Sequence, residues 1–279
     1  MTYKTILVSL NEVSQLRSVL SVAASIARKD EAHVIGLYVI PAVELLVGSE
    51  IQVLPVENDE LRVYFKQQEE AIKTAFENTI LKDGIQGEFR VVEALEPHIA
   101  ATVVEESREA DLVIVGYSSP ASNRALGADF SERLLIGSGR PTLVVPANSH
   151  GGLALDRILV GWNGSREAAR AIFDSIPLLH HADEVLVAFA GTDSEHRSRT
   201  ETRREGLVRT LLRHGVRARA IDLDSSREAG KVLLERAETR EIDLIVMGAY
   251  GHARLREFIL GGATRSVLKD MKCPVLFSH

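Results

Sequence analysis

The residues best suited to chemistry are spaced glycines near the C-terminal end of the chain. The set comprises Gly248, Gly251, Gly261 and Gly262, followed by Ala263 and Thr264. Glycines let a backbone approach phosphate oxygens closely, and the free N–H groups at a helix start supply donors and a favourable dipole. Glycines also serve turns and helix caps. Because this set lies between an apolar run and a helical pattern, we favour an anion-binding loop over a structural turn.

The elements that position this loop occur twice in the chain. Residues 5–11 match 157–163, residues 110–116 match 242–248, and residues 140–146 match 273–279. Three matched segments in the same order indicate a duplication. A polar stretch with glycines at 147–152 separates the halves. We therefore expect two domains, at 1–150 and 151–279.

Each half contains short apolar runs that are rich in branched residues. The runs lie at 6–10, 33–39, 88–92, 112–115 and 143–145, and at 158–162, 184–190, 216–223, 244–247 and 275–277. Runs of this kind suit the central strands of a parallel sheet that is covered on both faces. Amphipathic helical patterns alternate with them, at 16–27, 62–82, 97–108, 165–176, 197–214 and 227–240. The alternation predicts two doubly wound α/β domains, each with a five-stranded parallel sheet.

Two segments carry more specific expectations. In the helix predicted at 165–176, Ser165 is a natural N-cap, and an apolar stripe follows it at Ala168, Ala169, Ile172, Phe173 and Ile176. The first half also has an additional apolar segment at 41–60. This segment could be a lid or a docking patch, but loop statistics favour a flap packed on its own domain.

Strand order predicts where a ligand would bind. In an open α/β sheet, ligands occupy the crevice at the carboxyl ends of the strands, where the order reverses between the first and fourth strands. In the second half, Trp162 and Asn163 end the first strand, and Met247 and Gly248 end the fourth. Gly164 and Ser165 follow directly after Asn163, so these residues belong to the predicted site.

On these residues the chain resembles a tandem member of the universal stress protein family, over essentially its whole length. The family fingerprint is Gly, two residues, Gly, nine residues, then Gly followed by Ser or Thr. Gly248, Gly251 and Gly261 match it, and Gly262 stands where the hydroxyl residue belongs. The resemblance implies an adenine nucleotide alpha hydrolase-like fold. It also implies that two halves pair as a pseudo-two-fold dimer through their fifth strands, at 143–145 and 275–277.

The resemblance also assigns roles within the nucleotide site. ATP-binding members hold the phosphates and ribose with the fingerprint segment. Their aspartate that contacts the nucleoside corresponds to Asn163, an amide that keeps an acceptor oxygen but drops the charge. The backbone position that meets the adenine falls at about Ala190. A hydroxyl is available two residues beyond the expected position, at Thr264.

The first half has lost most of this pattern. Its segment begins at Gly116, but Ser119 replaces the second glycine, Pro120 lacks an N–H, and Gly127 comes too early. The glycines that follow 134–136 suit a helix C-cap better than a ligand loop. We expect the second half to bind and the first half to be structural.

Composition excludes several classes of protein. The net charge of -6 over 279 residues provides no basic face for nucleic acid. No apolar run approaches the length of about 18 residues that a membrane span needs. The single Cys273 excludes an internal disulfide framework and suits a reducing compartment, so we expect a cytoplasmic protein. Cys273 itself is expected to be a small buried hydrophobe rather than a nucleophile.

The leading functional hypothesis is a stress-response protein that binds ATP or AMP, with or without Mg²⁺, in a regulatory rather than catalytic role. No tightly bound metal is expected, because His180, His181 and His279 lack spaced partner ligands. One alternative is a scaffold or small-molecule carrier that uses segment 41–60. Another is a slow ATPase, for which neither a general base nor a metal carboxylate can be assigned. Association of two chains is left open by the sequence.

Overall fold

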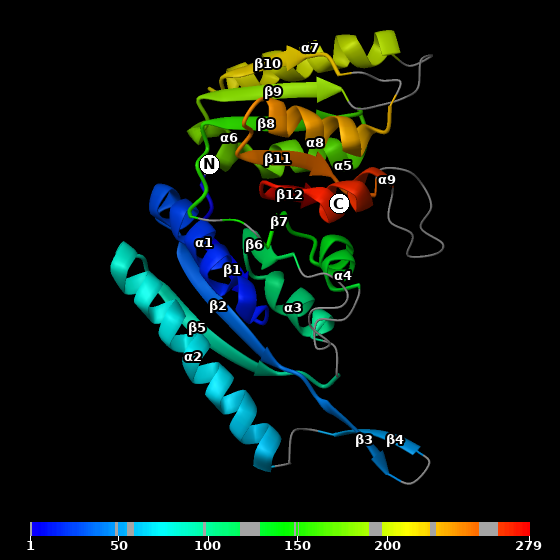
Figure 1. The fold of residues 1–279 in the computed structure, drawn as a ribbon. Helices are drawn as coiled ribbons and strands as arrows, with labels where there is room; N and C mark the ends of the chain where they lie inside the picture. The colour runs from blue at the N-terminus through cyan, green and yellow to red at the C-terminus, as the bar shows by residue number, and fades with distance from the viewer. Residues whose placement is uncertain are drawn as a thin grey trace. The chain divides into compact units, whose positions relative to one another are not determined.

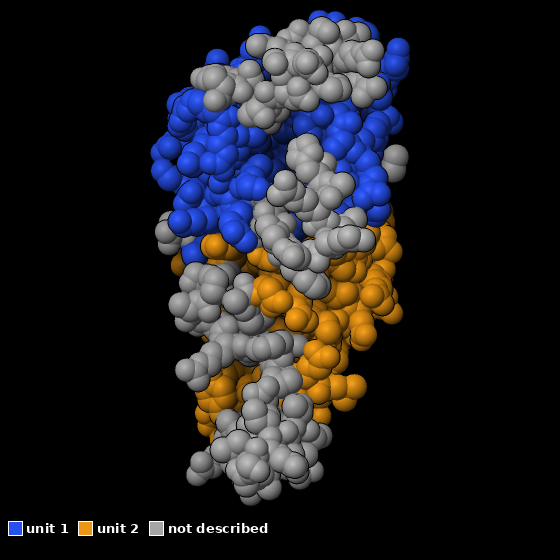
Figure 2. All heavy atoms as spheres, turned by 90° about the vertical axis from the view of Figure 1, so that its right-hand side faces the viewer, with its two compact units in different colours: residues 1–2, 141–279 blue, residues 3–140 orange. Residues whose placement is uncertain are grey.

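The computed structural model describes residues 2–47, 50–54, 59–96, 99–117, 129–147, 149, 151–189, 197–223, 227–250 and 262–279. The chain divides into two compact units, shown in different colours in Figure 2. One unit is Tyr3–Arg140, and the other is Met1–Thr2 with Pro141–His279. Each unit is described by itself below.

The unit of the second half is built on the parallel sheet that its sequence predicts. Its strand order is β10-β9-β8-β11-β12, and each neighbouring pair is parallel. The strands are β8 (Arg157–Trp162), β9 (Glu184–Phe189), β10 (Ala218–Ile221), β11 (Leu244–Gly248) and β12 (Val275–Ser278). Strand β7 (Thr142–Val145) adds to β12 in antiparallel direction, with Leu143 opposite Leu276. The predicted pairing of segments 143–145 and 275–277 is therefore present.

Helices cover both faces of this sheet (Figure 1). They are α5 (Arg166–Asp174), α6 (Ile176–His181), α7 (Arg197–Arg213), α8 (Ala229–Thr239) and α9 (Gly262–Asp270). A Cβ added at Gly161 would lie 3.2 Å from Leu233 of α8, whereas one added at Gly248 would lie 2.5 Å from the backbone N of Ala168 in α5. Gly161 pairs with Met247, the neighbour of Gly248. Since successive strand residues face opposite sides, α5 and α8 cover opposite faces.

The prediction of one helix over 165–176 needs two corrections. The helix ends at Asp174, and a second helix, α6, starts at Ile176 with Pro177 in its first turn, a position that proline tolerates. Phe173 is 45% exposed rather than part of the apolar stripe. The buried apolar residues of α5 are instead Ala168, Ala171 and Ile172. The apolar stripe is therefore shifted by about one residue, away from Phe173 and toward Ala171.

The unit of the first half has the same design. Its parallel strands follow the order β6-β1-β2-β5. They are β1 (Thr5–Ser9), β2 (His33–Ile40), β5 (Gly87–Glu93) and β6 (Leu112–Gly116). The helical elements are η1 (Val13–Gln15), α1 (Leu16–Asp30), α2 (Asp59–Asp83), α3 (Ala100–Ser107) and α4 (Phe130–Gly137). Strand β7, the expected fifth strand of this half, is grouped with the other unit by its contacts.

Two strands within the additional segment of the first half pair with each other, a feature that the sequence patterns do not predict. Strands β3 (Val43–Val47) and β4 (Glu50–Leu54) pair in antiparallel direction, with Val43 opposite Leu54. They make a two-stranded sheet of their own, separate from the main sheet. Within 41–60, residues 43–47 and 50–54 are thus two short strands, and Asp59 begins α2.

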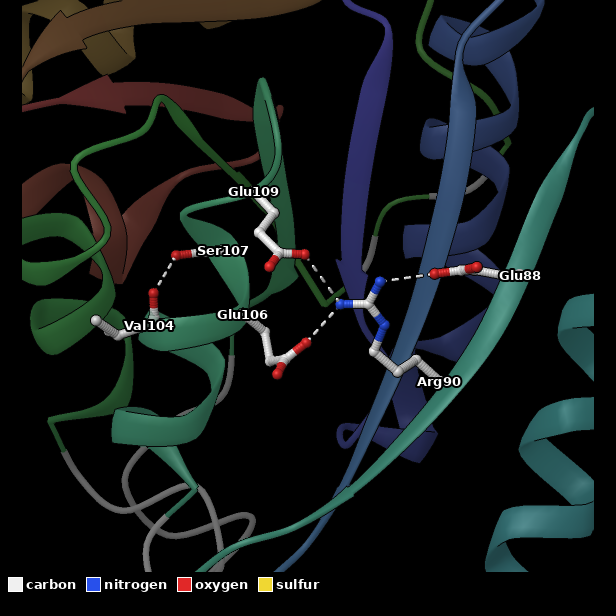
Figure 3. Close-up of polar contacts among 6 residues, drawn as sticks. All are labelled: Glu88, Arg90, Val104, Glu106, Ser107 and Glu109. Carbon is white, nitrogen blue, oxygen red and sulfur yellow. Dashed lines mark hydrogen bonds and ion pairs between the residues drawn. The ribbon is translucent and has the colours of Figure 1, made fainter.

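Charged residues protect the edge strand β5 (Figure 3). The Arg90 guanidinium lies 2.6 Å from the Glu106 carboxylate, 3.5 Å from Glu109 and 2.7 Å from Glu88. Hydrogen bonds to Glu106 and Glu88 raise the pKa of Arg90 above its ordinary value, so the group stays charged. These contacts join β5 to α3 and place charge on an edge that would otherwise invite another strand.

The aspartate of the repeated Asp-Leu pair has a structural role in both halves. The Asp111 carboxylate accepts hydrogen bonds from the backbone N–H groups of Lys4 (2.8 Å) and Thr5 (3.0 Å). The Asp243 carboxylate accepts one from the backbone N–H of Arg157 at 2.8 Å. Each aspartate therefore ties the start of the fourth strand to the start of the first, at the amino edge of the sheet.

None of the helices in the described part of the chain has the length and apolar character needed to cross a membrane.

The Asp111 contacts generate a stability prediction. Asp111→Ala should lower the free energy of unfolding by about 1 to 3 kcal/mol, because two charge-assisted hydrogen bonds to β1 are lost. Asp111→Asn should cost less, since an amide oxygen can still accept. Urea unfolding followed by circular dichroism measures both. Equal stability of the alanine variant and the wild type would contradict the assigned role.

Candidate functional site

Two of the predicted crevice segments, 162–165 and 247–248, lie at the carboxyl ends of neighbouring strands in the second half. Strands β8 and β11 are parallel neighbours, with Gly161 opposite Met247. Strand β9 lies on the other side of β8, so the strand order reverses between β8 and β11. In Figure 1 the arrowheads of β9 and β11 point toward the same edge. Trp162 and Gly248, the last residues of β8 and β11, therefore end side by side.

A tight turn follows β8 and starts α5. The Asn163 Oδ1 accepts a hydrogen bond from the backbone N–H of Ser165 at 3.0 Å, and Gly164 between them has a φ of 77°. The Ser165 hydroxyl in turn accepts from the N–H of Ala168 at 3.1 Å, which confirms the predicted N-cap. Asn163 remains exposed at the edge of the sheet.

Close packing explains the first glycine of the fingerprint. A Cβ at Gly248 would come within 2.5 Å of the backbone of Glu167 and Ala168 in α5. A Cβ at Gly116, the matching glycine of the first half, would come within 2.6 Å of the Gln15 side chain. In both halves the element after the first strand lies against the end of the fourth, through backbone atoms at Gly248 and through the Gln15 side chain at Gly116. Close packing thus explains why the first half keeps Gly116 although the rest of its glycine fingerprint differs.

The helix starts at this edge differ in charge. Glu167 lies in the first turn of α5 with 6% of its surface exposed, and Glu228 is the N-cap residue of α8. The first turn of α9 contains no acidic residue. A helix start favours negative charge, and α5 and α8 already have a carboxylate of their own. Of these three helices, α9 is the one whose start is left for an external anion.

Both carboxylates are held in the ionised form. Burial opposes ionisation of Glu167, but hydrogen bonds from Arg166, its own backbone N–H and Ser165 outweigh it and lower its pKa. Hydrogen bonds from Ser266 and Lys231 lower the pKa of Glu228. Neither residue stands out as a site residue in the sequence alone. An acidic residue two positions after the Ser165 N-cap was the available signal for Glu167.

The first turn of α9 exposes backbone. Gly262 is exposed, and a Cβ added there would meet nothing within 4 Å. Ala263 is half-buried, whereas Thr264 is 3% exposed. Gly262 and Ala263 are thus the more exposed residues of this turn, while Thr264 lies on the buried side of α9. The other predicted site residues, Ala190, Gly251 and Gly261, lie outside the described residues.

Two apolar residues lie beneath the crevice. Trp162 is 8% exposed, and its Nε1 has no hydrogen-bond acceptor within the described part of the chain. Met247 is also buried and lies beside Gly161, on the α8 face of the sheet. A buried N–H group usually has a protein, water or ligand partner. Trp162 is thus an available donor at the end of β8.

In the first half, a side chain occupies the equivalent strand end. Asn11, the counterpart of Asn163, is 8% exposed. Its Nδ2 donates to the backbone O of Val39 at 2.7 Å, and its Oδ1 accepts from the Val39 N–H at 3.0 Å. His33 and Glu184 begin the equivalent strands β2 and β9, so Val39 corresponds to Ala190. One amide therefore uses both backbone groups that a ligand could contact there.

The remaining candidates have structural explanations. Gly139 has a φ of 64° just after α4, which confirms the predicted helix end. Burial and the nearby Asp243 charge raise the pKa of Cys273 to about 12, so this half-buried thiol stays protonated at neutral pH. Across the described ranges, no three His, Cys, Asp or Glu residues are grouped to hold a metal ion. The His279 ring lies 3.2 Å from the backbone O of Ala249.

Comparison with known sequences gives one family. The universal stress protein family matches the chain twice, over residues 2–146 and 154–279. A curated relative, universal stress protein Slr1230 of Synechocystis sp. (strain ATCC 27184 / PCC 6803 / Kazusa), is 25% identical over 183 residues. That alignment covers 60% of this chain and 57% of the relative. The chain therefore matches somewhat more than half the length of this relative.

Solved structures show the same fold. A universal stress protein from Archaeoglobus fulgidus DSM 4304 has a TM-score of 0.75 at 17% identity, covering 99% of this chain and 96% of that one. A functionally unknown protein from Pseudomonas aeruginosa PAO1 has a TM-score of 0.59 at 16% identity, covering 99% and 92%. The predicted fold class is confirmed over the whole chain.

The two equivalent asparagines generate a matched prediction. Asn11→Ala should lower the free energy of unfolding by about 2 to 4 kcal/mol, because it leaves the N–H and C=O of Val39 unpaired in a buried place. Asn163→Ala, which removes an exposed amide with one local hydrogen bond, should cost less than about 1 kcal/mol. Chemical denaturation of the two variants checks the difference. A larger loss at Asn163 than at Asn11 would refute it.

Proposed function

This chain belongs to the universal stress protein family, and we propose that it binds an adenine nucleotide, ATP or AMP, in its second half. The observation that carries the proposal is the start of α9. It follows the glycines 248, 251 and 261, it exposes the backbone of Gly262 and Ala263, and it has no carboxylate in its first turn. Such a helix start attracts a phosphate group through its free N–H groups and its dipole.

Within the proposed site, the backbone from Gly251 to Ala263 would hold the phosphates, and Asn163 would face the nucleoside. Ala190 would meet the base through its backbone. Gly164 and Ser165 shape the turn that places Asn163, and Trp162, Met247 and Gly248 form the floor. Thr264 would contribute its N–H rather than its hydroxyl, because its side chain is buried. Where ATP binds with Mg²⁺, the ion would come with the nucleotide.

The contrast between the halves supports one site per chain. Asn11 already uses the backbone N–H and O of Val39 in the first half. The Asn163 side chain instead accepts a hydrogen bond from the N–H of Ser165 in its own turn and stays exposed. The proposed role is regulatory, in that a bound nucleotide would bias the conformation or a partner contact of a cytoplasmic stress-response protein. We assign no reaction to the bound nucleotide.

The hairpin of β3 and β4 favours a second candidate function. Its two apolar strands form a separate sheet, as a docking element for a partner or small molecule would. A scaffold of this kind would lose partner binding when residues 43–56 are deleted. It would keep that binding when Gly251 is replaced by Val, whereas nucleotide binding would show the opposite pattern.

The only tryptophan provides the direct test of the leading proposal. Titration with AMP or ATP should change Trp162 fluorescence and saturate, and calorimetry should give one site per chain. Adenosine should bind more weakly than AMP, because it offers no phosphate to α9. If neither nucleotide binds at millimolar concentration, the proposed function is wrong.

Gly262 offers a charge test that leaves packing intact, since a side chain there meets nothing within 4 Å. Gly262→Glu should weaken AMP binding by at least about tenfold, because it gives α9 a carboxylate of its own. Gly262→Gln is the neutral control and should stay close to the wild type. Gly262→Ser restores the family hydroxyl and should strengthen binding about two- to fivefold. Equal weakening by Glu and Gln would argue against phosphate at this position.

A further inference from the structure

Helices α8 and α9 touch at their first turns. Gly230 is the second residue of α8, and a Cβ added there would lie 2.9 Å from the backbone O and 3.1 Å from the Cα of Ala263. It would also lie 3.0 Å from the Cβ of Ser266. Two of these three neighbours are backbone atoms of α9, which cannot turn aside as a flexible side chain can. Any larger residue at 230 must therefore shift the first turns of α8 and α9 relative to each other.

A hydrogen bond fixes the same contact. The Ser266 hydroxyl donates to the Glu228 carboxylate, and Lys231 lies 3.2 Å from the other oxygen of that carboxylate. Glu228 is the N-cap residue of α8, and Ser266 lies one turn into α9. Lys231 also balances the negative charge that Glu228 brings close to α9. The start of α9 is thus held by close packing at Gly230 and by a charged hydrogen bond at Glu228.

The opposite ends of the two helices are joined more loosely. Lys272, which follows α9, lies 2.7 Å from Glu238 near the end of α8. Both side chains are largely exposed, so this ion pair contributes little on its own. The contact at their first turns therefore constrains the start of α9 more tightly than this ion pair does.

We propose that Gly230 and Glu228 are positioning residues for phosphate. They set the place and direction of the N–H groups at Gly262 and Ala263, and so control the phosphate-dependent part of nucleotide affinity without touching the ligand. The inference rests on the proposed nucleotide function. It adds that α8, which contributes none of the predicted site residues, decides how well the site discriminates a nucleotide from its nucleoside.

The test compares AMP with adenosine. Gly230→Ala should weaken AMP binding by about tenfold or more, since a small misplacement of several N–H groups is costly, and should change adenosine binding less than about twofold. The matched control is Gly206→Ala in α7, where an added Cβ meets nothing nearer than Arg209 at 3.9 Å. It should leave both affinities unchanged. Glu228→Ala should weaken AMP selectively by about threefold, and Glu228→Gln, which keeps an acceptor for Ser266, should restore most of it.

The outcomes separate the inference from the proposed function. If the wild type binds AMP but Gly230→Ala binds it equally well, or loses AMP and adenosine in proportion, the inference is wrong and the proposed function stands. If the wild type binds neither ligand, both fail. Circular dichroism and thermal unfolding report the fold of each variant. Should Gly230→Ala not fold, the two Glu228 substitutions decide, because a selective loss of AMP binding is still expected for alanine alone.

Discussion

The end of strand β11 has no room for a side chain, and much of the second-half site depends on that constraint. A Cβ at Gly248 would come within 2.5 Å of the α5 backbone. The start of α5 therefore lies directly against the fourth strand, and the chain after β8 must turn sharply to reach it. Gly164, with its positive φ, and the hydrogen bond from Ser165 to Asn163 make that turn. Glu167 becomes buried beside the glycine as a consequence.

Helix starts dominate the electrostatics of this edge. In a doubly wound sheet, the helices that follow the strands all begin at the carboxyl edge, so several partial positive charges gather there. Glu167 and Glu228 compensate two of them from within the protein, and hydrogen bonds keep both residues ionised. The described first turn of α9 contains no acidic residue, and neither does that of α7. Under the proposed function, the start of α9 is where the phosphate of a nucleotide would bind.

Both halves of the duplicated chain have an asparagine after their first strand, but the two asparagines make different hydrogen bonds. Asn11 bridges β1 to β2 through both backbone groups of Val39, whereas Asn163 bonds within its own turn. The residues beside them explain the difference. Gly164 and Ser165 form a tight turn and a cap, while the first half has Glu12 and Val13 there and continues into a short 3-10 helix. A change in the turn residues beside one asparagine can thus let the asparagine side chain take the place of a ligand at that strand end.

The sequence by itself determined the duplication, the strands of both sheets, the N-cap at Ser165 and the helix end at Gly139. These features depend on local patterns, because apolar runs, caps and glycines act within a few residues of chain. The sequence did not reveal that Phe173 is exposed, that β3 pairs with β4, or that Asn11 is bonded to Val39. Nor did it show that Gly230 lies against Ala263, or that Glu228 accepts from Ser266. Only the tertiary structure decided these contacts, because each depends on how distant segments pack, and packing leaves no periodic signal in the chain.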